Sequence, residues 1–240
     1  FKTGIRSARF NKLDENTSTL FDIFRQSNYT FFSFTPTFSE TIGLFPKFQN
    51  QNNLYDFTER LDSGLGDKIL NIFSSLPTNN PWFLNIHLMD LHFPLVVPTS
   101  FKNESFGFSK YEQIISSMDQ WIGIFVKKIN FDNTILIITA DHGTYIKKVK
   151  KESEVIDLED DGESEILKKK LVSRAPKFLK PLKDKIFFMK QNKNKSKIST
   201  FLSKYDLMPH EKRALLSGNF SIDHELHDEK IRVPLLFVGS

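Results

Sequence analysis

The run Thr134-Ile135-Leu136-Ile137-Ile138-Thr139-Ala140 is followed directly by Asp141 and His142. Its nearly continuous apolar, β-branched composition is typical of a central parallel strand that is covered on both faces. Open α/β sheets bind their ligands at the C-terminal ends of such strands, and here a carboxylate and an imidazole follow that end. Both groups are ligands for divalent cations, so the run predicts a metal site at the edge of the sheet. The alternative is that Asp141 caps the following turn and His142 is an ordinary loop residue.

Helical and strand patterns alternate on both sides of this run. The segment 111–129 has apolar residues at helical spacing and two lysines at its C-terminal end, which favours an amphipathic helix. Further helices are expected over residues 14–27 and 66–75, further strands over residues 29–34, 82–88 and 233–238, and a surface loop over residues 37–53. We interpret the chain as an α/β protein in which all four strands share one mainly parallel central sheet with helices on both faces.

Residues 147–220 interrupt this alternation. They carry runs of charge and a Lys/Asn-rich stretch over residues 190–197, so we expect mostly helix and loop outside the sheet. The sequence therefore predicts an α/β core over residues 1–146, a basic, mostly helical insertion over residues 147–220, and a return to the core with the final strand over residues 221–240.

The composition of the 240-residue chain argues against several classes of protein. No run of about 18 apolar residues occurs, so no transmembrane helix is predicted. The chain has neither a phosphate-binding glycine loop nor a dinucleotide fingerprint, and its lack of cysteine favours a reducing compartment such as the cytoplasm. The net charge of +4 is concentrated in the lysines of residues 147–204. Because the acidic run 157–165 interrupts these lysines and aromatic residues do not alternate with them, we expect no nucleic-acid partner.

Four short motifs follow one another along the chain: Asp119-Gln120-Trp121-Ile122-Gly123, Asp132-Asn133-Thr134, Thr139-Ala140-Asp141-His142-Gly143 and Asp228-Glu229-Lys230-Ile231-Arg232-Val233-Pro234. Their order and spacing resemble the sulfatase branch of the alkaline phosphatase superfamily. The resemblance implies an alkaline-phosphatase-like fold and hydrolysis of a sulfate ester of a small molecule or glycan. It leaves open a phosphodiesterase or a phosphoryl or phosphoglycerol transferase of the same superfamily, because the motifs serve both anions.

The resemblance also implies that Asp141 and His142 bind the catalytic metal. Ca²⁺ prefers oxygen ligands, whereas an Asp–His pair also suits Mn²⁺, Mg²⁺ or Zn²⁺, so the identity of the divalent cation stays open. The family's nucleophile precedes the matched region, and neither Thr3 nor Ser7 lies in the Pro-Ser-Arg context that would mark it. We therefore expect a partial site that has no turnover without an upstream nucleophile. The non-enzymatic alternative is a degenerate member that binds a polyanion through its lysine-rich insertion.

Two further histidines are candidates for the substrate side of the site. The segment His87-Leu88-Met89-Asp90-Leu91-His92-Phe93-Pro94 resembles the family motif in which the later histidine approaches the ester oxygen. His92 is therefore a catalytic candidate that either donates a hydrogen bond to an oxyanion or protonates the leaving alkoxide. The alternative is that His92 is a loop histidine packed against Phe93. His87, inside the strand, is expected to be structural. The second catalytic candidate is His224, in the loop before the last strand, with His227 as its alternative.

We expect the candidate side chains to meet at one place. Four of them should converge on a cleft at the C-terminal ends of the strands: Asp141, His142, His92 and His224. The guanidinium of Arg232 also fits sulfate or phosphate, but its place before a buried strand favours a structural pairing with Asp228 or Glu229.

Overall fold

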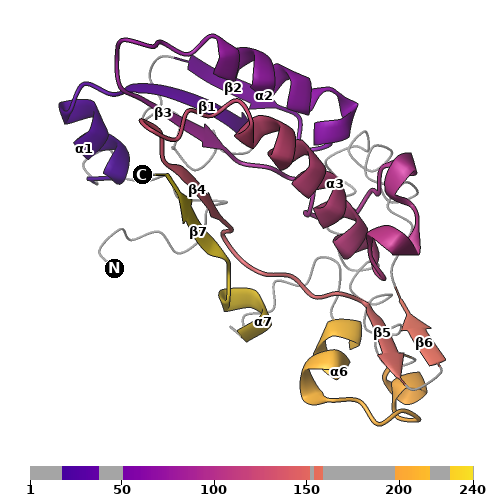
Figure 1. Cartoon of the computed structure of the whole chain (residues 1–240). Helices are drawn as coiled ribbons and strands as arrows, with labels where there is room; N and C mark the ends of the chain where they lie inside the picture. Colours follow the sequence, from indigo (N-terminus) through magenta and orange to yellow (C-terminus); the bar gives the residue numbers. More distant parts are fainter. Residues whose placement is uncertain (1–17, 38–50, 152–153, 159–197, 217–227, 240) are drawn as a thin grey trace, which may run out of the picture. The chain divides into compact units, whose positions relative to one another are not determined.

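The computed structural model describes residues 18–37, 51–151, 154–158, 198–216 and 228–239 (Figure 1). The chain divides into two compact units, Phe1–His92 and Phe93–Ser240. None of the helices in the described ranges has both the length and the apolar character that a membrane span requires.

The first unit is built on a three-stranded parallel sheet (Figure 1). Its strands are β1 (Thr30–Pro36), β2 (Gln51–Tyr55) and β3 (Trp82–Ile86), in the order β2-β1-β3. Its helices are α1 (Leu20–Gln26), the 3-10 helix η3 (Leu61–Ser63) and α2 (Leu65–Ser74). Because the three strands run in one direction, their C-terminal ends lie at the same edge of the sheet.

Helices cover both faces of this sheet. On one face, the rings of Phe21 and Phe24 lie with their centroids 5.5 and 5.4 Å from that of Phe83. On the other face, the ring of Phe73 in α2 lies 5.9 Å from that of Trp82. Trp82 and Phe83 are neighbours in β3, and neighbouring side chains of a strand point to opposite faces. The prediction of a parallel sheet flanked by helices is confirmed for this unit.

The middle strand β1 lies at the centre of the first unit's core. Phe31 and Phe34 are only 2% and 3% exposed, and Leu65 and Ile69 of α2 are completely buried. Each large apolar side chain buried in this way contributes about 1.5–3 kcal/mol to folding. The loops at the C-terminal edge of the sheet therefore start from well-packed strand ends.

The second unit contains the amphipathic helix that the sequence predicts over residues 111–129. This helix is α3 (Lys110–Val126), and a capping box at Ser109 starts it. The Ser109 hydroxyl accepts a hydrogen bond from the backbone N–H of Glu112 at 3.2 Å, and the Glu112 carboxylate accepts one from the N–H of Ser109 at 2.7 Å. The short 3-10 helices η4 (Thr99–Phe101) and η5 (Glu104–Phe106) precede it.

The strand before Asp141 is β4 (Leu136–Thr139), and its one partner in the described ranges is β7 (Leu235–Val238). The two strands are antiparallel, with Thr139 opposite Leu235. The helix α7 (Asp228–Ile231) brings the chain to the C-terminal end of β4, so the chain enters β7 there and runs back along β4. The sequence predicts mainly parallel strands, whereas this pair is antiparallel. Apolar composition favoured strands here but does not encode their direction.

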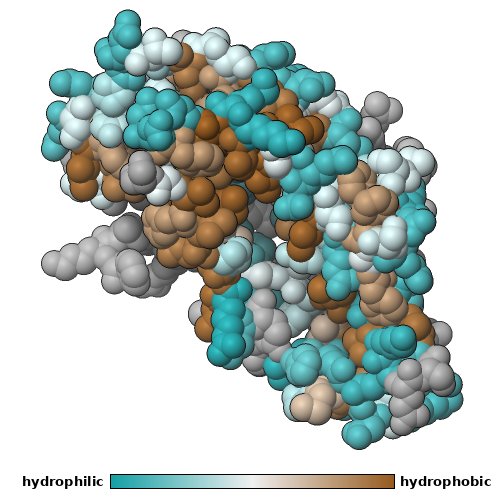
Figure 2. All heavy atoms as spheres, in the orientation of Figure 1, coloured by the Kyte–Doolittle hydropathy of each residue, from teal (hydrophilic) through white to brown (hydrophobic). Residues whose placement is uncertain are grey.

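The apolar side chains of β4 and β7 are largely exposed. Ile137 and Phe237 are 52% and 60% exposed, and Figure 2 shows apolar side chains at the surface over these two strands. The coverage on both faces that the sequence run predicts is therefore not found among the described residues.

The described part of residues 147–220 has a small hydrophobic core of its own. The strands β5 (Lys148–Lys151) and β6 (Glu154–Asp157) form an antiparallel pair, which the sequence did not predict, and the helix α6 (Pro209–Leu216) follows later in the chain. Apolar side chains from β6, from the segment before α6 and from α6 itself are buried together: Ile156, Leu202 and Leu215. An ion pair of 2.9 Å between Lys151 Nζ and Glu211 Oε2 joins β5 to α6.

Candidate functional site

Asp141 and His142 form an exposed turn directly after β4. Asp141 Oδ1 accepts a hydrogen bond from the backbone N–H of His142 at 2.9 Å, and His142 Nδ1 lies 2.8 Å from the carbonyl oxygen of Gly143. The side chains are 69% and 62% exposed, respectively. Each side chain is thus oriented by the backbone of a neighbouring residue. These two hydrogen bonds do not involve Asp141 Oδ2 and His142 Nε2.

The remaining atoms of this pair have a separation that suits a shared cation. Asp141 Oδ2 lies 3.9 Å from His142 Nε2. Two ligands that each lie about 2.0–2.2 Å from one ion are roughly 3–4 Å apart. When Nδ1 carries the proton and donates it to the Gly143 carbonyl, Nε2 has the lone pair that a metal needs. Asp141 therefore caps the turn with one oxygen and leaves the other available to a cation, so the two interpretations of its role are compatible.

The described residues supply two ligands of such a site and not a complete set. Within those residues, no group of three or more His, Cys, Asp and Glu side chains could hold a metal ion. The donor chemistry of Asp141 and His142 fits a divalent cation, and any further ligand has to come from other residues or from water.

The backbone of the Asp141 turn is bonded to the segment that leads into β7. The Gly143 N–H donates to the Lys230 carbonyl at 2.8 Å. Arg232 Nη2 lies 3.3 Å from Asp228 Oδ2, and both side chains are largely exposed. The predicted structural pairing of Arg232 with Asp228 is confirmed.

His92 ends a turn at the C-terminal edge of the parallel sheet. We call residues 89–92 the His92 turn, which the His92 N–H closes by donating to the Met89 carbonyl at 3.0 Å. His92 is exposed, whereas Met89 and Asp90 are only 5% and 6% exposed. The turn thus has a buried side that packs against the unit and an exposed side that carries the imidazole.

His87 has the structural position that the sequence predicts, although its side chain is only half-buried. Its N–H donates to the Phe34 carbonyl at 2.9 Å, which extends the pairing of β1 and β3 by one residue. Its carbonyl accepts a short hydrogen bond from the Tyr55 hydroxyl. The backbone of His87 therefore ties the ends of all three strands together.

A buried polar group for which sequence patterns predict no role lies beside this turn. Asp90 Oδ1 accepts a hydrogen bond from the Leu61 N–H at 3.0 Å, and Tyr55 and Arg60 are buried nearby, 3% and 6% exposed. Burial raises the pKa of the Asp90 carboxyl above its usual range. Burial, and then the charge of Asp90, raises the pKa of the Tyr55 hydroxyl, and burial lowers the pKa of Arg60. The sequence signal was an acid between two apolar residues, Met89 and Leu91, directly after a strand.

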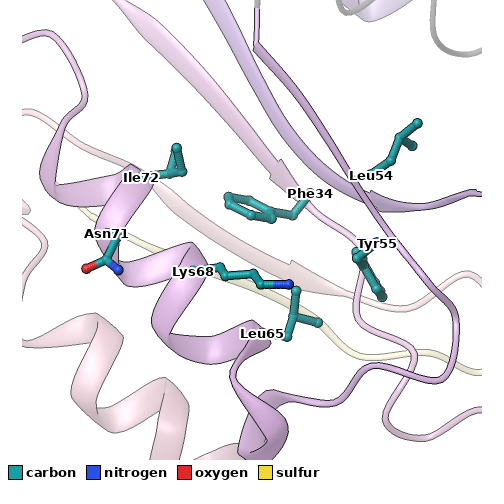
Figure 3. A pocket seen from close by; sticks show the side chains of 7 residues that line it. All are labelled: Phe34, Leu54, Tyr55, Leu65, Lys68, Asn71 and Ile72. Atoms are coloured by element: carbon teal, nitrogen blue, oxygen red, sulfur yellow. The ribbon is translucent and has the colours of Figure 1, made fainter.

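An open cavity of about 310 Å³ lies between α2 and the strands β1 and β2 (Figure 3). Its lining is mostly apolar, with one cation: Phe34, Leu54, Tyr55, Leu65, Lys68, Asn71 and Ile72. Lys68 Nζ is paired with Glu59 Oε2 at 2.6 Å. The cation is therefore already neutralised by a carboxylate of the same unit.

His224 and His227 lie outside the described residues. The expected convergence of Asp141, His142, His92 and His224 stays a prediction.

A comparison with protein families identifies the chain. The model of the Sulfatase family matches residues 2–240, which includes the His92 turn, the Asp141 turn and the strand that follows Arg232. A comparison with curated proteins gives no match. Since the family model extends over nearly the whole sequence, the chain belongs to the sulfatase family, an α/β family of ester hydrolases.

Proposed function

We propose that the protein hydrolyses sulfate esters with the help of a divalent cation bound by Asp141 and His142. The observation that carries this proposal is the separation of 3.9 Å between Asp141 Oδ2 and His142 Nε2, in a chain of the sulfatase family. A bound cation would act as a Lewis acid and neutralise charge that develops on the ester oxygens.

The protein's own contribution at this turn is to keep the two ligands in their binding forms. The Gly143 carbonyl favours the tautomer in which Nδ1 of His142 carries the proton, so that Nε2 is free of it. Zn²⁺ and Mn²⁺ fit the mixed oxygen and nitrogen donors better than Ca²⁺ does.

We assign the proton that the leaving group needs to His92. When the bond between sulfur and the ester oxygen breaks, the alkoxide takes a proton from the imidazolium of His92 and leaves as the alcohol. The imidazole is then neutral and regains its proton from water. The nucleophile that attacks the sulfur is a group that Asp141, His142 and His92 do not supply.

The test is metal analysis and ester hydrolysis by the full-length protein. We expect about one tightly held divalent cation per chain, faster hydrolysis of nitrophenyl sulfate than of nitrophenyl phosphate, and a loss of roughly 100-fold or more after chelation. Faster hydrolysis of the phosphate ester would replace the proposal by phosphoryl transfer. Salt-dependent binding of a polyanion without a tightly held metal would replace it by the degenerate, non-catalytic member.

A further inference from the structure

We propose that Asp90 and Tyr55 are positioning residues, which hold the His92 turn on the parallel sheet and so orient the His92 imidazole. The proposal rests on the role proposed above for His92. Neither residue needs to touch the substrate, because both act through the backbone of the turn.

The first anchor is the Tyr55 hydroxyl. Tyr55 ends β2, one edge strand of the sheet, and its hydroxyl donates a hydrogen bond to the carbonyl of His87, which directly follows the other edge strand β3. The bond therefore links the two edge strands at the level of the last residues of β1, the strand between them. It fixes the point at which the chain leaves β3 and begins the His92 turn.

The second anchor is the Asp90 carboxylate. Asp90 lies inside the turn, and its Oδ1 accepts a hydrogen bond at 3.0 Å from the N–H of Leu61, the first residue of η3. Arg60, directly before it, donates to the carbonyls of Phe57 and Glu59 at 2.6 and 3.1 Å, which shapes the segment that presents this N–H. The turn is thereby bonded to a second element of the unit that is distant in sequence.

The burial of Asp90 supports a role in holding the turn. Asp90 is 6% exposed, and its second oxygen, Oδ2, has no hydrogen-bond partner among the described residues. Burying a carboxylate that is only partly hydrogen-bonded costs free energy, and an apolar residue would fill the site at less cost. A charged acceptor nevertheless makes a stronger hydrogen bond to an N–H than a neutral one does, which suits a turn that has to stay in one conformation.

The direct test is amide hydrogen exchange in the full-length protein. Asp90→Leu removes the acceptor and keeps the approximate size, so protection of the Leu61 and His92 amides should fall about 10- to 100-fold. Asp90→Asn keeps an acceptor oxygen and should retain most of the protection. Asp62→Asn is the matched control, because it removes an exposed carboxylate from the same 3-10 helix and should change neither amide.

Tyr55→Phe is a second variant in case Asp90→Leu does not fold. It removes only the hydroxyl of the first anchor and should lower the protection of the His92 amide while the sheet amides stay protected. Unchanged protection of His92 in Asp90→Leu or in Tyr55→Phe would overturn the proposal, whatever the activity of the protein.

A kinetic arm separates orientation of His92 from general stability. A proton donor matters most for a poor leaving group, so Asp90→Leu should lower hydrolysis of an alkyl sulfate by about 100-fold and of nitrophenyl sulfate by about tenfold or less. His92→Ala should show the same selectivity, and the double variant should lose little more than either single variant. An equal loss on both esters would overturn the positioning role. If the wild-type protein hydrolyses neither ester, the proposed function fails, and the exchange result alone decides whether the two anchors hold the turn.

Discussion

Asp90 and Asp141 each follow the C-terminal end of a strand, and their surroundings are opposite. Asp90 comes after β3, is 6% exposed and accepts a hydrogen bond from Leu61, a residue 29 positions earlier. Asp141 comes after β4, has a side chain that is 69% exposed and accepts its hydrogen bond from the next residue, His142. The same side chain at the same kind of position therefore joins separate elements in one case and faces solvent in the other.

This difference in exposure suits the two carboxylates to different roles: one restrains a turn and the other can bind a ligand. A carboxylate enclosed by protein and bonded to a remote backbone N–H restrains the chain, but it is poorly placed to coordinate an ion that arrives from solvent. An exposed carboxylate with an oxygen to spare adds little to stability, yet it can coordinate a cation. We therefore expect substitutions of Asp141 to affect activity and substitutions of Asp90 to affect stability as well.

The largest expected effect is on hydrolysis in the Asp141→Ala variant of the full-length protein. Loss of a first ligand should abolish metal retention and lower kcat/KM by roughly 100-fold or more, while the free energy of unfolding of the metal-free protein changes by less than about 0.5 kcal/mol. The measurements are metal analysis, ester hydrolysis and urea denaturation. Asp132→Ala is the matched control, because this aspartate is also exposed near β4. Retained metal and activity in Asp141→Ala would show that the exposed aspartate is an ordinary turn residue.

The next effect is on stability in the Asp90→Leu variant. Removal of the acceptor leaves the buried Leu61 N–H unbonded and takes away the carboxylate with the largest effect on the buried Arg60, so unfolding should become easier by about 2–3 kcal/mol. Urea denaturation measures this loss, with Asp62→Asn as the exposed control. A loss as small as that of Asp141→Ala would mean that the two aspartates do not differ as their burial suggests.

The pH dependence of stability should show a smaller effect of Asp90. Burial raises the folded-state pKa of Asp90 above the usual 3.8, so between these two values the folded protein holds a proton that the unfolded chain has released. Stability from this group is therefore full below about 3.8 and falls as pH rises through the folded-state pKa, with a slope of at most about 1.4 kcal/mol per pH unit. Urea denaturation of wild type and Asp90→Asn over a series of pH values isolates the contribution of Asp90 to stability. A difference that grew in favour of wild type with rising pH would contradict the sign.

Sequence patterns predict correctly the elements whose apolar residues are buried in the fold. The strand expected over residues 29–34 is β1, and the helix expected over residues 66–75 is α2. The first residues of β2 fall in the loop that the sequence predicts over residues 37–53. Gln51, Asn52 and Asn53 lack strand composition, and their pairing with β1 is a tertiary contact. The direction of β7 was missed for a similar reason, since it depends on where α7 delivers the chain.

The residues of the candidate site also differ in how far the sequence predicts them. Asp141 and His142 were recognisable because they are adjacent in sequence, and their separation follows from that adjacency. The anchors of the His92 turn were not recognisable, because Tyr55, Leu61 and Asp90 meet only after the parallel sheet has formed. Sequence patterns therefore indicate candidate ligand-binding groups more readily than the groups that we propose hold such candidates in place.

The smallest expected effect is that of Arg232→Ala, next to the Asp141 turn. Arg232 and Asp228 form an i,i+4 ion pair with side chains that are 83% and 69% exposed, so its loss should cost no more than about 0.5 kcal/mol. The cost should shrink further in 0.5 M salt, roughly the regime in which exposed ion pairs are screened, and urea denaturation at low and high salt measures both values. Arg232→Lys keeps the charge and is the matched control. A role in binding the ester would give a different result, because a guanidinium binds a sulfate or phosphate group through two hydrogen bonds and Lys cannot reproduce that geometry. If both variants kept full stability but lost hydrolysis by about tenfold or more, Arg232 would be a contact to the anionic ester, and the exposed turn would bind its substrate as well as its cation.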